Sequence, residues 1–97
     1  MRVVSKKILR EFWKKHNDSR EPLKTWYKEA NKAKWTSPAD IKSEYVKASI
    51  LKKGRVVFNI CGNKYRLVTA INYKRHWVFI RFIGTHNDYD KINAEEI

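Results

Sequence analysis

The chain has 97 residues, enough for one hydrophobic core but too few for two, so we expect a single domain over residues 1–97. Hydrophobic residues make up 42% of it, which excludes a disordered basic tail. Lys and Arg number 22 against 10 Asp and Glu, a formal net charge of +12. Such a one-sided charge favours a polyanionic partner, an acidic protein partner, or both.

The only cysteine, Cys61, cannot form an intramolecular disulfide, and we interpret it as a small buried thiol. No apolar run approaches the roughly 20 residues that span a membrane. The segment Met1–Lys7 is not followed by the apolar core of a signal peptide. These features predict a cytoplasmic protein with no membrane partner.

The first half of the chain predicts an edge strand and a helical hairpin. Arg2–Val4 is short and β-prone, and apolar residues at helical spacing then predict one helix over 6–16 and a second that ends near Lys34 and Trp35. A third, short helix is expected from Ala39 to about Glu44, and 45–53 is ambiguous between loop and strand. The expected N-caps of the three helices are Ser5, Ser19 and Ser37.

The second half of the chain predicts an antiparallel meander of three strands. The runs 56–60, 65–71 and 77–83 are rich in β-branched and aromatic residues, and short polar breaks separate them. The whole pattern predicts a small α+β domain with a helical hairpin packed on an antiparallel sheet of about four strands. The last ten residues are polar, with one helical turn possible between Tyr89 and Glu95.

Strand alternation places charged and apolar residues together on one face of the meander. Arg66 shares a face with Val68 and Ala70. Arg81 shares one with Phe79 and Ile83, which leaves the opposite face to Val78, Ile80 and Phe82. A partly apolar and partly cationic face is typical of a groove that holds a polyanion.

The residue types favour metal-free cleavage of RNA among the enzyme classes. The chain has no glycine-rich phosphate loop, no zinc spacing, no clustered carboxylates for a two-metal nuclease and no motif that supports a serine triad. RNA carries its own nucleophile, the 2′-hydroxyl. The protein then needs only cations for the phosphorane and a proton-transfer group.

We therefore predict a catalytic set at the end of the sheet and basic contacts around it. Arginine stabilises phosphorane charge, histidine transfers protons near neutral pH, and tyrosine donates a proton or stacks on a base. Each of these residues also has a structural alternative: His86 as a strand-end cap, Tyr89 as a core aromatic, Arg66 as the partner of a carboxylate such as Asp90. The predicted catalytic residues are Arg66, Arg81, His86 and Tyr89, and the predicted RNA-binding residues are Lys52, Lys53, Arg55, Asn63 and Lys64.

The sequence resembles the HigB toxins of the RelE/ParE superfamily of type II toxin–antitoxin systems. The resemblance runs nearly end to end, and its specific parts are the turn 62–66 (Gly-Asn-Lys-Tyr-Arg) and the segment 84–90 (Gly-Thr-His-x-x-Tyr-Asp). It implies helices on an antiparallel sheet and a ribosome-dependent mRNA endonuclease without a cofactor or metal. It also implies a HigA-like helix-turn-helix antitoxin. The toxin would contact operator DNA only indirectly, through this antitoxin.

The resemblance also implies roles for the predicted residues. Arg66 and Arg81 would hold the scissile phosphate, His86 would be the general acid or base, and Tyr89 would stack or relay a proton. No general-base glutamate is evident on the sheet, which leaves the base open between His86 and a lysine. Two other functions remain: a toxin of the same fold that acts on a protein target such as gyrase, and a non-catalytic RNA-binding module.

Overall fold

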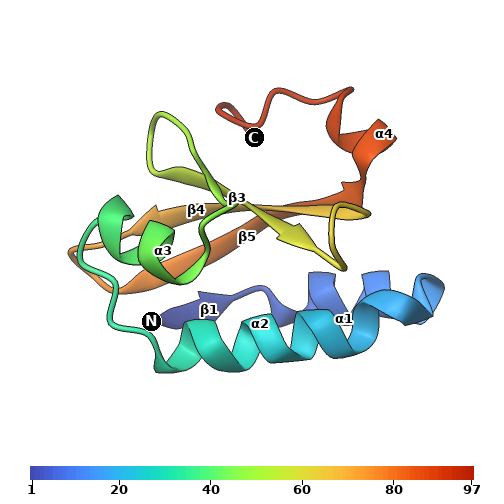
Figure 1. Ribbon diagram of the computed structural model, residues 1–97, viewed down its shortest axis with the longest axis horizontal. Helices are drawn as coiled ribbons and strands as arrows, with labels where there is room; N and C mark the ends of the chain where they lie inside the picture. The colour runs from blue at the N-terminus through green and yellow to red at the C-terminus, as the bar shows by residue number, and fades with distance from the viewer.

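The computed structural model describes residues 1–97 and has three layers: a helical hairpin, a five-stranded sheet and a C-terminal segment on the far side of the sheet (Figure 1). The sheet order is β1-β5-β4-β3-β2. The helices are α1 (Lys6–Lys15), η1 (Asn17–Ser19), α2 (Arg20–Lys32), α3 (Pro38–Glu44) and α4 (His86–Tyr89), and the strands are β1 (Arg2–Val4), β2 (Ser49–Ile50), β3 (Arg55–Ile60), β4 (Tyr65–Asn72) and β5 (Trp77–Thr85).

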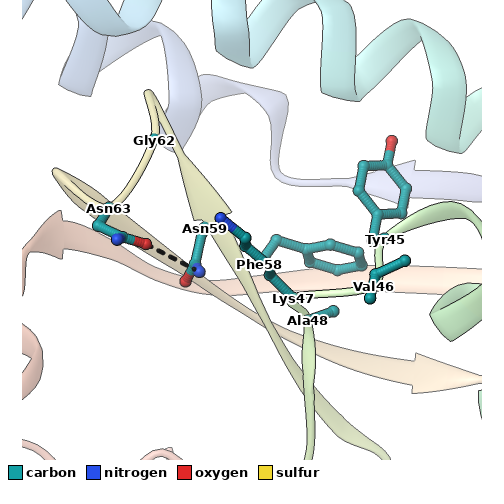
Figure 2. Close-up of a pocket in the computed structure, with 8 residues that line it drawn as sticks. All are labelled: Tyr45, Val46, Lys47, Ala48, Phe58, Asn59, Gly62 and Asn63. Atoms are coloured by element: carbon teal, nitrogen blue, oxygen red, sulfur yellow. Dashed lines mark hydrogen bonds between the residues drawn. The ribbon is translucent and has the colours of Figure 1, made fainter.

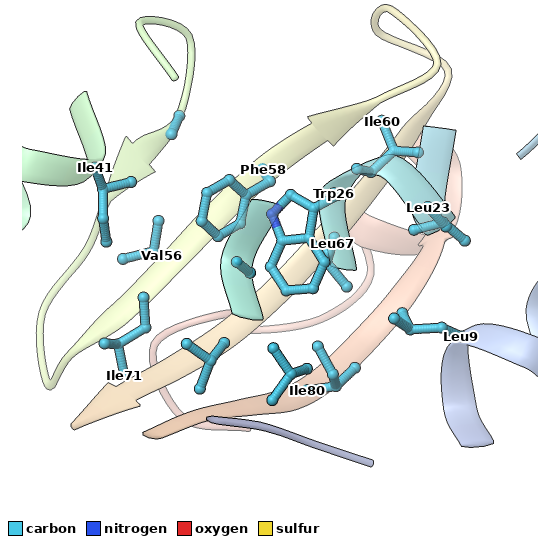
Figure 3. Close-up of a cluster of buried hydrophobic side chains, with 14 of the residues drawn as sticks. Leu9, Leu23, Trp26, Ile41, Val56, Phe58, Ile60, Leu67, Ile71 and Ile80 are labelled. Atoms are coloured by element: carbon cyan, nitrogen blue, oxygen red, sulfur yellow. The ribbon is translucent and has the colours of Figure 1, made fainter. Parts of the chain in front are cut away.

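The helical hairpin buries the apolar stripes that the sequence predicts. Leu9 and Trp13 of α1 and Leu23 and Trp26 of α2 are buried against the sheet. Figure 3 shows Trp26 and both leucines facing the apolar side chains of β3, β4 and β5. The second helix ends at Lys32, earlier than predicted, because the chain turns there and Trp35, which is 1% exposed, enters the core from the connection.

Ser5, Ser19 and Ser37 stand at the N-cap positions of α1, α2 and α3 as predicted, but none of their hydroxyls accepts the expected hydrogen bond from its helix. Ser5 has a left-handed backbone (φ 81°), and Ser37 makes no cap bond. The Ser19 hydroxyl instead donates to the His16 carbonyl at 2.6 Å, and Ser19 is fully buried. At α3 the carboxylate of Asp40 accepts from the backbone N–H and hydroxyl of Thr36, at 2.8 and 2.9 Å. A carboxylate inside the first turn therefore holds the chain that enters α3.

The meander is confirmed, and the sheet around it is larger and more mixed than predicted. β3, β4 and β5 are joined by two antiparallel hairpins. β1 is an edge strand as expected, but it pairs with β5 in parallel. The helices and the strands β2, β3 and β4 separate the two in the chain, so no tight turn forces them to be antiparallel. The ambiguous segment supplies β2, a two-residue strand that pairs with Val56 and Val57. The fold is therefore α+β with five strands rather than about four.

A β-bulge in β5 changes the predicted alternation at Phe82. Val68 pairs with Phe82 and Thr69 with Ile80, so Arg81 is an extra residue without a partner on β4. Ile80 remains in the main core, whereas Phe82 packs on the opposite face of the sheet. Ile83, beyond the bulge, packs against the main core. The predictions that Phe82 shares a face with Ile80, and Ile83 with Phe79, were therefore wrong, because strict alternation does not hold across a bulge.

The second face of the sheet is covered by the C-terminal segment, which no pattern in the sequence predicted. Ala94 is buried against Val57 and Val68. Around these three residues pack Leu51, Phe82, Tyr89, Ile92 and Ile97. The helical turn at this end is α4, from His86 to Tyr89, earlier than the expected 89–95, because the Thr85 hydroxyl accepts the Asp88 N–H at 3.2 Å and caps it. None of the helices is both long and apolar enough to cross a membrane.

Candidate active site at one end of the sheet

Arg66 lies at the start of β4, next to the β3–β4 turn and to the end of β5, from which α4 begins. Its register partners are Asn59 on β3 and Gly84 on β5, two residues before α4 begins. It lies on the second face of the sheet, opposite the core residue Leu67, and is half-buried. Its guanidinium Nη1 donates to the Asn63 carbonyl at 2.8 Å. Nη1 also donates to the Tyr65 carbonyl at 3.4 Å, whereas Nε and Nη2 have no protein acceptor and are free to bind an anion.

Gly84 allows α4 to fold back beside Arg66. A Cβ at this position would lie 2.6 Å from the ring of Phe82 and 3.1 Å from the Cβ of Asp88. The absence of a side chain therefore lets the strand end, the aromatic ring and the first turn of α4 come together. The structure confirms that α4 packs against both β4 and β5.

His86 and Tyr89 both lie on α4, but the His86 side chain is exposed and that of Tyr89 is partly buried. The His86 side chain is 56% exposed, and its Nδ1 lies 3.1 Å from Oδ2 of Asp90. An ionised carboxylate can only accept, so this contact places a proton on Nδ1 and leaves Nε2 to exchange a proton with a substrate. Tyr89 packs on the second-face cluster and is partly buried. Asp90, which the sequence offered as a partner for Arg66, is instead the partner of His86.

The turn between β3 and β4 is held by a carboxylate from the helical hairpin. Asp18 of η1 accepts from the Tyr65 hydroxyl at 2.6 Å through Oδ1 and forms an ion pair with Lys64 through Oδ2. Within the turn Cys61 and Gly62 both have left-handed backbones, with φ of 56° and 68°. Lys64, a predicted RNA-binding residue, is therefore paired with a carboxylate in this structure.

The contacts of Asp18 shift the pKa values of all three side chains. The hydrogen bonds from Lys64 and Tyr65 hold the pKa of Asp18 below its ordinary value. The same contacts raise the pKa of Lys64 and, with burial, that of Tyr65. At neutral pH the lysine and carboxylate are therefore charged and the phenol is neutral, which is the state in which all the contacts form.

Arg81 lies apart from Arg66 along the sheet. It is the bulged residue of β5, is exposed, and its guanidinium lies 5.5 Å from the centre of the Phe79 ring. Phe79 precedes it on the strand, whereas Gly84, the partner of Arg66, follows it. The two arginines make no recorded contact with each other. To turn toward α4, the guanidinium of Arg81 would have to leave the Phe79 ring.

The predicted RNA-binding residues divide between the two ends of β3. Asn63 and Lys64 lie beyond its end, near Arg66, whereas Lys52, Lys53 and Arg55 lie at its start, about 17 Å away along the strand. Arg55 donates to the Ile97 carbonyl through Nε and Nη2, at 3.0 and 2.6 Å. It therefore fastens the C-terminal segment, while Lys52 and Lys53 are exposed in the β2–β3 turn.

A groove of about 290 Å³ adjoins the Arg66 end of the sheet on the β3 side. Its walls are the segment Tyr45–Ala48 on one side and Phe58, Asn59, Gly62 and Asn63 on the other. Figure 2 shows the amides of Asn59 and Asn63 facing each other, with a hydrogen bond of 3.3 Å between them. Asn63 thus lines the groove with its side chain and holds Arg66 with its carbonyl.

Sequence reasoning missed Asp18, and it had no local signal that could have found it. Asp18 lies 46 residues before Lys64 and 47 before Tyr65. In the sequence it reads as one polar residue of an interhelical turn. No three His, Cys, Asp or Glu side chains are grouped so as to hold a metal ion.

Residues 19–92 match the HigB toxin family, described as the RelE-like toxic component of a toxin–antitoxin system. This is most of the chain. The chain belongs to the HigB toxin family. No match was found among curated proteins.

The match places all nine predicted site residues of this HigB-family toxin inside the region shared with its family. That region runs from α2 through α4 and contains β2 to β5. The family assignment confirms the resemblance and the expected fold. It also makes this chain a toxin of a toxin–antitoxin system, a class that implies an antitoxin partner. Asp18 lies just outside the matched region.

Proposed function

We propose that this HigB-family toxin is a ribosome-dependent mRNA endonuclease that halts translation and growth in the cytoplasm. The observation that carries the proposal is the juxtaposition at one end of the sheet: an exposed imidazole oriented by a carboxylate, beside the strand end that bears Arg66. The net charge of +12 supports a polyanionic substrate. A HigA-like antitoxin with a helix-turn-helix domain would neutralise the toxin.

The cleavage needs no cofactor or metal, because RNA supplies the nucleophile. The 2′-oxygen loses its proton to a base and attacks the adjacent phosphorus, and the 5′-oxygen leaves with a proton from an acid. The products are a 2′,3′-cyclic phosphate and a 5′-hydroxyl. Nε2 of His86 serves as the acid or the base, since Asp90 holds the proton on Nδ1.

The remaining predicted residues bind the substrate. Arg66 offers its free guanidinium N–H groups to the scissile phosphate and stabilises the additional charge of the phosphorane. Arg81 binds the phosphate from the neighbouring strand after leaving Phe79, and Tyr89 stacks on a base or relays a proton. Asn63 and Lys64 contact RNA beside Arg66. Lys52, Lys53 and Arg55 contact it at the far end of β3.

The test is a cleavage assay on purified mRNA with and without ribosomes. We expect cuts within the reading frame only when ribosomes are present, with 2′,3′-cyclic phosphate ends on the upstream fragment. Mapping of mRNA 5′ ends after expression in cells gives the same readout in vivo. Intact messages in cells whose growth is fully arrested would overturn the proposal and favour a protein target.

A further inference from the structure

The backbone around the turn between β3 and β4 supplies both protein contacts of the Arg66 guanidinium. Nη1 of Arg66 donates to the carbonyls of Asn63 at 2.8 Å and of Tyr65 at 3.4 Å, so neither acceptor is a side chain. The direction of the guanidinium therefore follows the path of the backbone through residues 63–65. A displacement of this turn would move the group that is proposed to bind the scissile phosphate.

The turn, residues 61–64, has a backbone that its own residues do not favour. Cys61 has a φ of 56°, in the left-handed region that a residue with a Cβ rarely adopts. Within the turn one backbone hydrogen bond forms, from the Lys64 N–H to the Cys61 carbonyl at 3.2 Å. The side chains of Asn59 and Asn63 add a bond of 3.3 Å. The conformation of the turn therefore depends on further contacts with another element.

A single carboxylate of the helical layer supplies these contacts. Oδ1 of Asp18 accepts from the Tyr65 hydroxyl at 2.6 Å, and Oδ2 forms an ion pair with the Lys64 ammonium. The backbone carbonyl of Asp18 lies 3.7 Å from Sγ of Cys61, whose thiol donates to it. Asp18 thus contacts the first and the last residue of the turn and the first residue of β4.

Both Asp18 and the phenol that it binds are held by their surroundings. Ser19, the next residue of η1, is fully buried and donates its hydroxyl to the His16 carbonyl at 2.6 Å. The rings of Phe12 and His16 pack on the ring of Tyr65, with centroids 5.1 and 5.4 Å from it. Tyr65 is 2% exposed, so it cannot leave Asp18 without opening the core.

The ion pair between Asp18 and Lys64 is too exposed to serve stability alone. The two side chains are 40% and 60% exposed, and ion pairs in such settings contribute little to the free energy of unfolding. The hydrogen bonds from Lys64 and Tyr65 lower the pKa of Asp18, so the carboxylate is ionised at neutral pH and accepts from both partners. What these contacts fix is the geometry of the turn beside Arg66.

We propose that Asp18 is a positioning residue for the proposed cleavage: it holds the turn from the helical layer and thereby fixes the Arg66 guanidinium at the scissile phosphate. Asp18 does not touch the substrate but acts through Lys64 and Tyr65 on the backbone that Arg66 binds. The family match begins at residue 19 and does not include it. The inference rests on the proposed function in taking Arg66 as the phosphate-binding group.

The test compares Asp18→Asn and Tyr65→Phe with the control Asp40→Asn. An asparagine offers one acceptor oxygen where Asp18 uses two, and Tyr65→Phe removes only the hydroxyl that Asp18 accepts. The control removes the same charge from a carboxylate that holds the start of α3 through Thr36, at 2.8 and 2.9 Å. Cleavage is measured as a single-turnover rate constant on mRNA-loaded ribosomes at saturating toxin, so that a smaller folded fraction does not lower it.

We expect Asp18→Asn to lower this rate constant about tenfold and Tyr65→Phe to lower it by a smaller factor, because a displaced guanidinium loses its contact in the transition state. The toxin concentration at half-saturation should change by less than about twofold. The NMR order parameters of the backbone amides of residues 61–66 should fall in Asp18→Asn from about 0.85 to below about 0.6. Asp40→Asn should change none of the three quantities.

Other outcomes overturn the inference. An unchanged rate constant in Asp18→Asn would show that Arg66 needs no support from the helical layer. Equal losses in Asp18→Asn and Asp40→Asn would show a general effect on the fold, and slower cleavage with unchanged order parameters would show that Asp18 does not act through the turn. If the proposed cleavage is itself wrong, even the unaltered protein gives no ribosome-dependent cuts, and the order parameters alone decide whether Asp18 fixes the turn.

Discussion

At the scale of single residues, the candidate chemistry depends on the imidazole of His86 and the guanidinium of Arg66. We expect His86→Ala and Arg66→Ala each to lower ribosome-dependent cleavage by at least about 100-fold, because one removes the proton-transfer group and the other a phosphorane contact. Growth arrest should be lost in parallel. The control is His76→Asn, in the β4–β5 turn, where asparagine tolerates the left-handed backbone (φ 59°). Full toxicity of both folded alanine variants would remove these residues from the mechanism.

Asp18 gives a second prediction at the residue scale. Its pKa is lowered in the folded state from the ordinary value of 3.8, chiefly by hydrogen bonds from Lys64 and Tyr65. The carboxylate therefore contributes stability above about pH 3.8, which is lost as the pH falls through the lower folded-state pKa. Urea unfolding of the protein and of Asp18→Asn should differ at pH 7, and the difference should shrink toward zero below pH 3.8. A difference that does not vary with pH would show that the charge of Asp18 does not matter.

At the scale of elements, the C-terminal segment is the third layer that covers the second face of the sheet. Ala94 is 7% exposed against Val57 and Val68, so Ala94→Asp would bury an unpaired charge or detach the segment. We expect a loss of about 1–3 kcal/mol in the free energy of unfolding and faster tryptic cleavage after Lys91. Asn93→Asp, which adds the same charge at an exposed neighbour, should change neither. Equal stability of the two variants would mean that the segment does not pack on the sheet in solution.

At the scale of the whole molecule, the excess of positive charge acts on the stability of the fold. The net charge is +12, and the three ion pairs are exposed and therefore weak. Repulsion among the unpaired cations should be relieved by salt. We expect the melting temperature to rise by about 4–8 °C between 10 and 300 mM KCl, which corresponds to about 1 kcal/mol for a domain of this size. A melting temperature that falls with salt would mean that attractive pairs dominate.

The part of the fold that the sequence alone determined is the part encoded by local patterns. The helical hairpin and the three-strand meander follow from apolar spacing and turn residues, because hydrophobic periodicity reports which face of each element is buried. The positions of His86 at a strand end and of Arg66 after a turn follow in the same way. The HigB family was also readable in the sequence, since the turn 62–66 and the segment 84–90 are local motifs.

Only the tertiary structure decided the features that depend on contacts between distant segments. The pairing of Asp18 with Lys64 and Tyr65, the parallel register of β1, and the covering of the second face by the last residues all join parts of the chain that no periodic pattern relates. The bulge at Arg81 likewise arises from pairing between strands, and it moved Phe82 to the opposite face. A sequence pattern specifies which side of an element is apolar, whereas the geometry of packing decides which distant element covers that side.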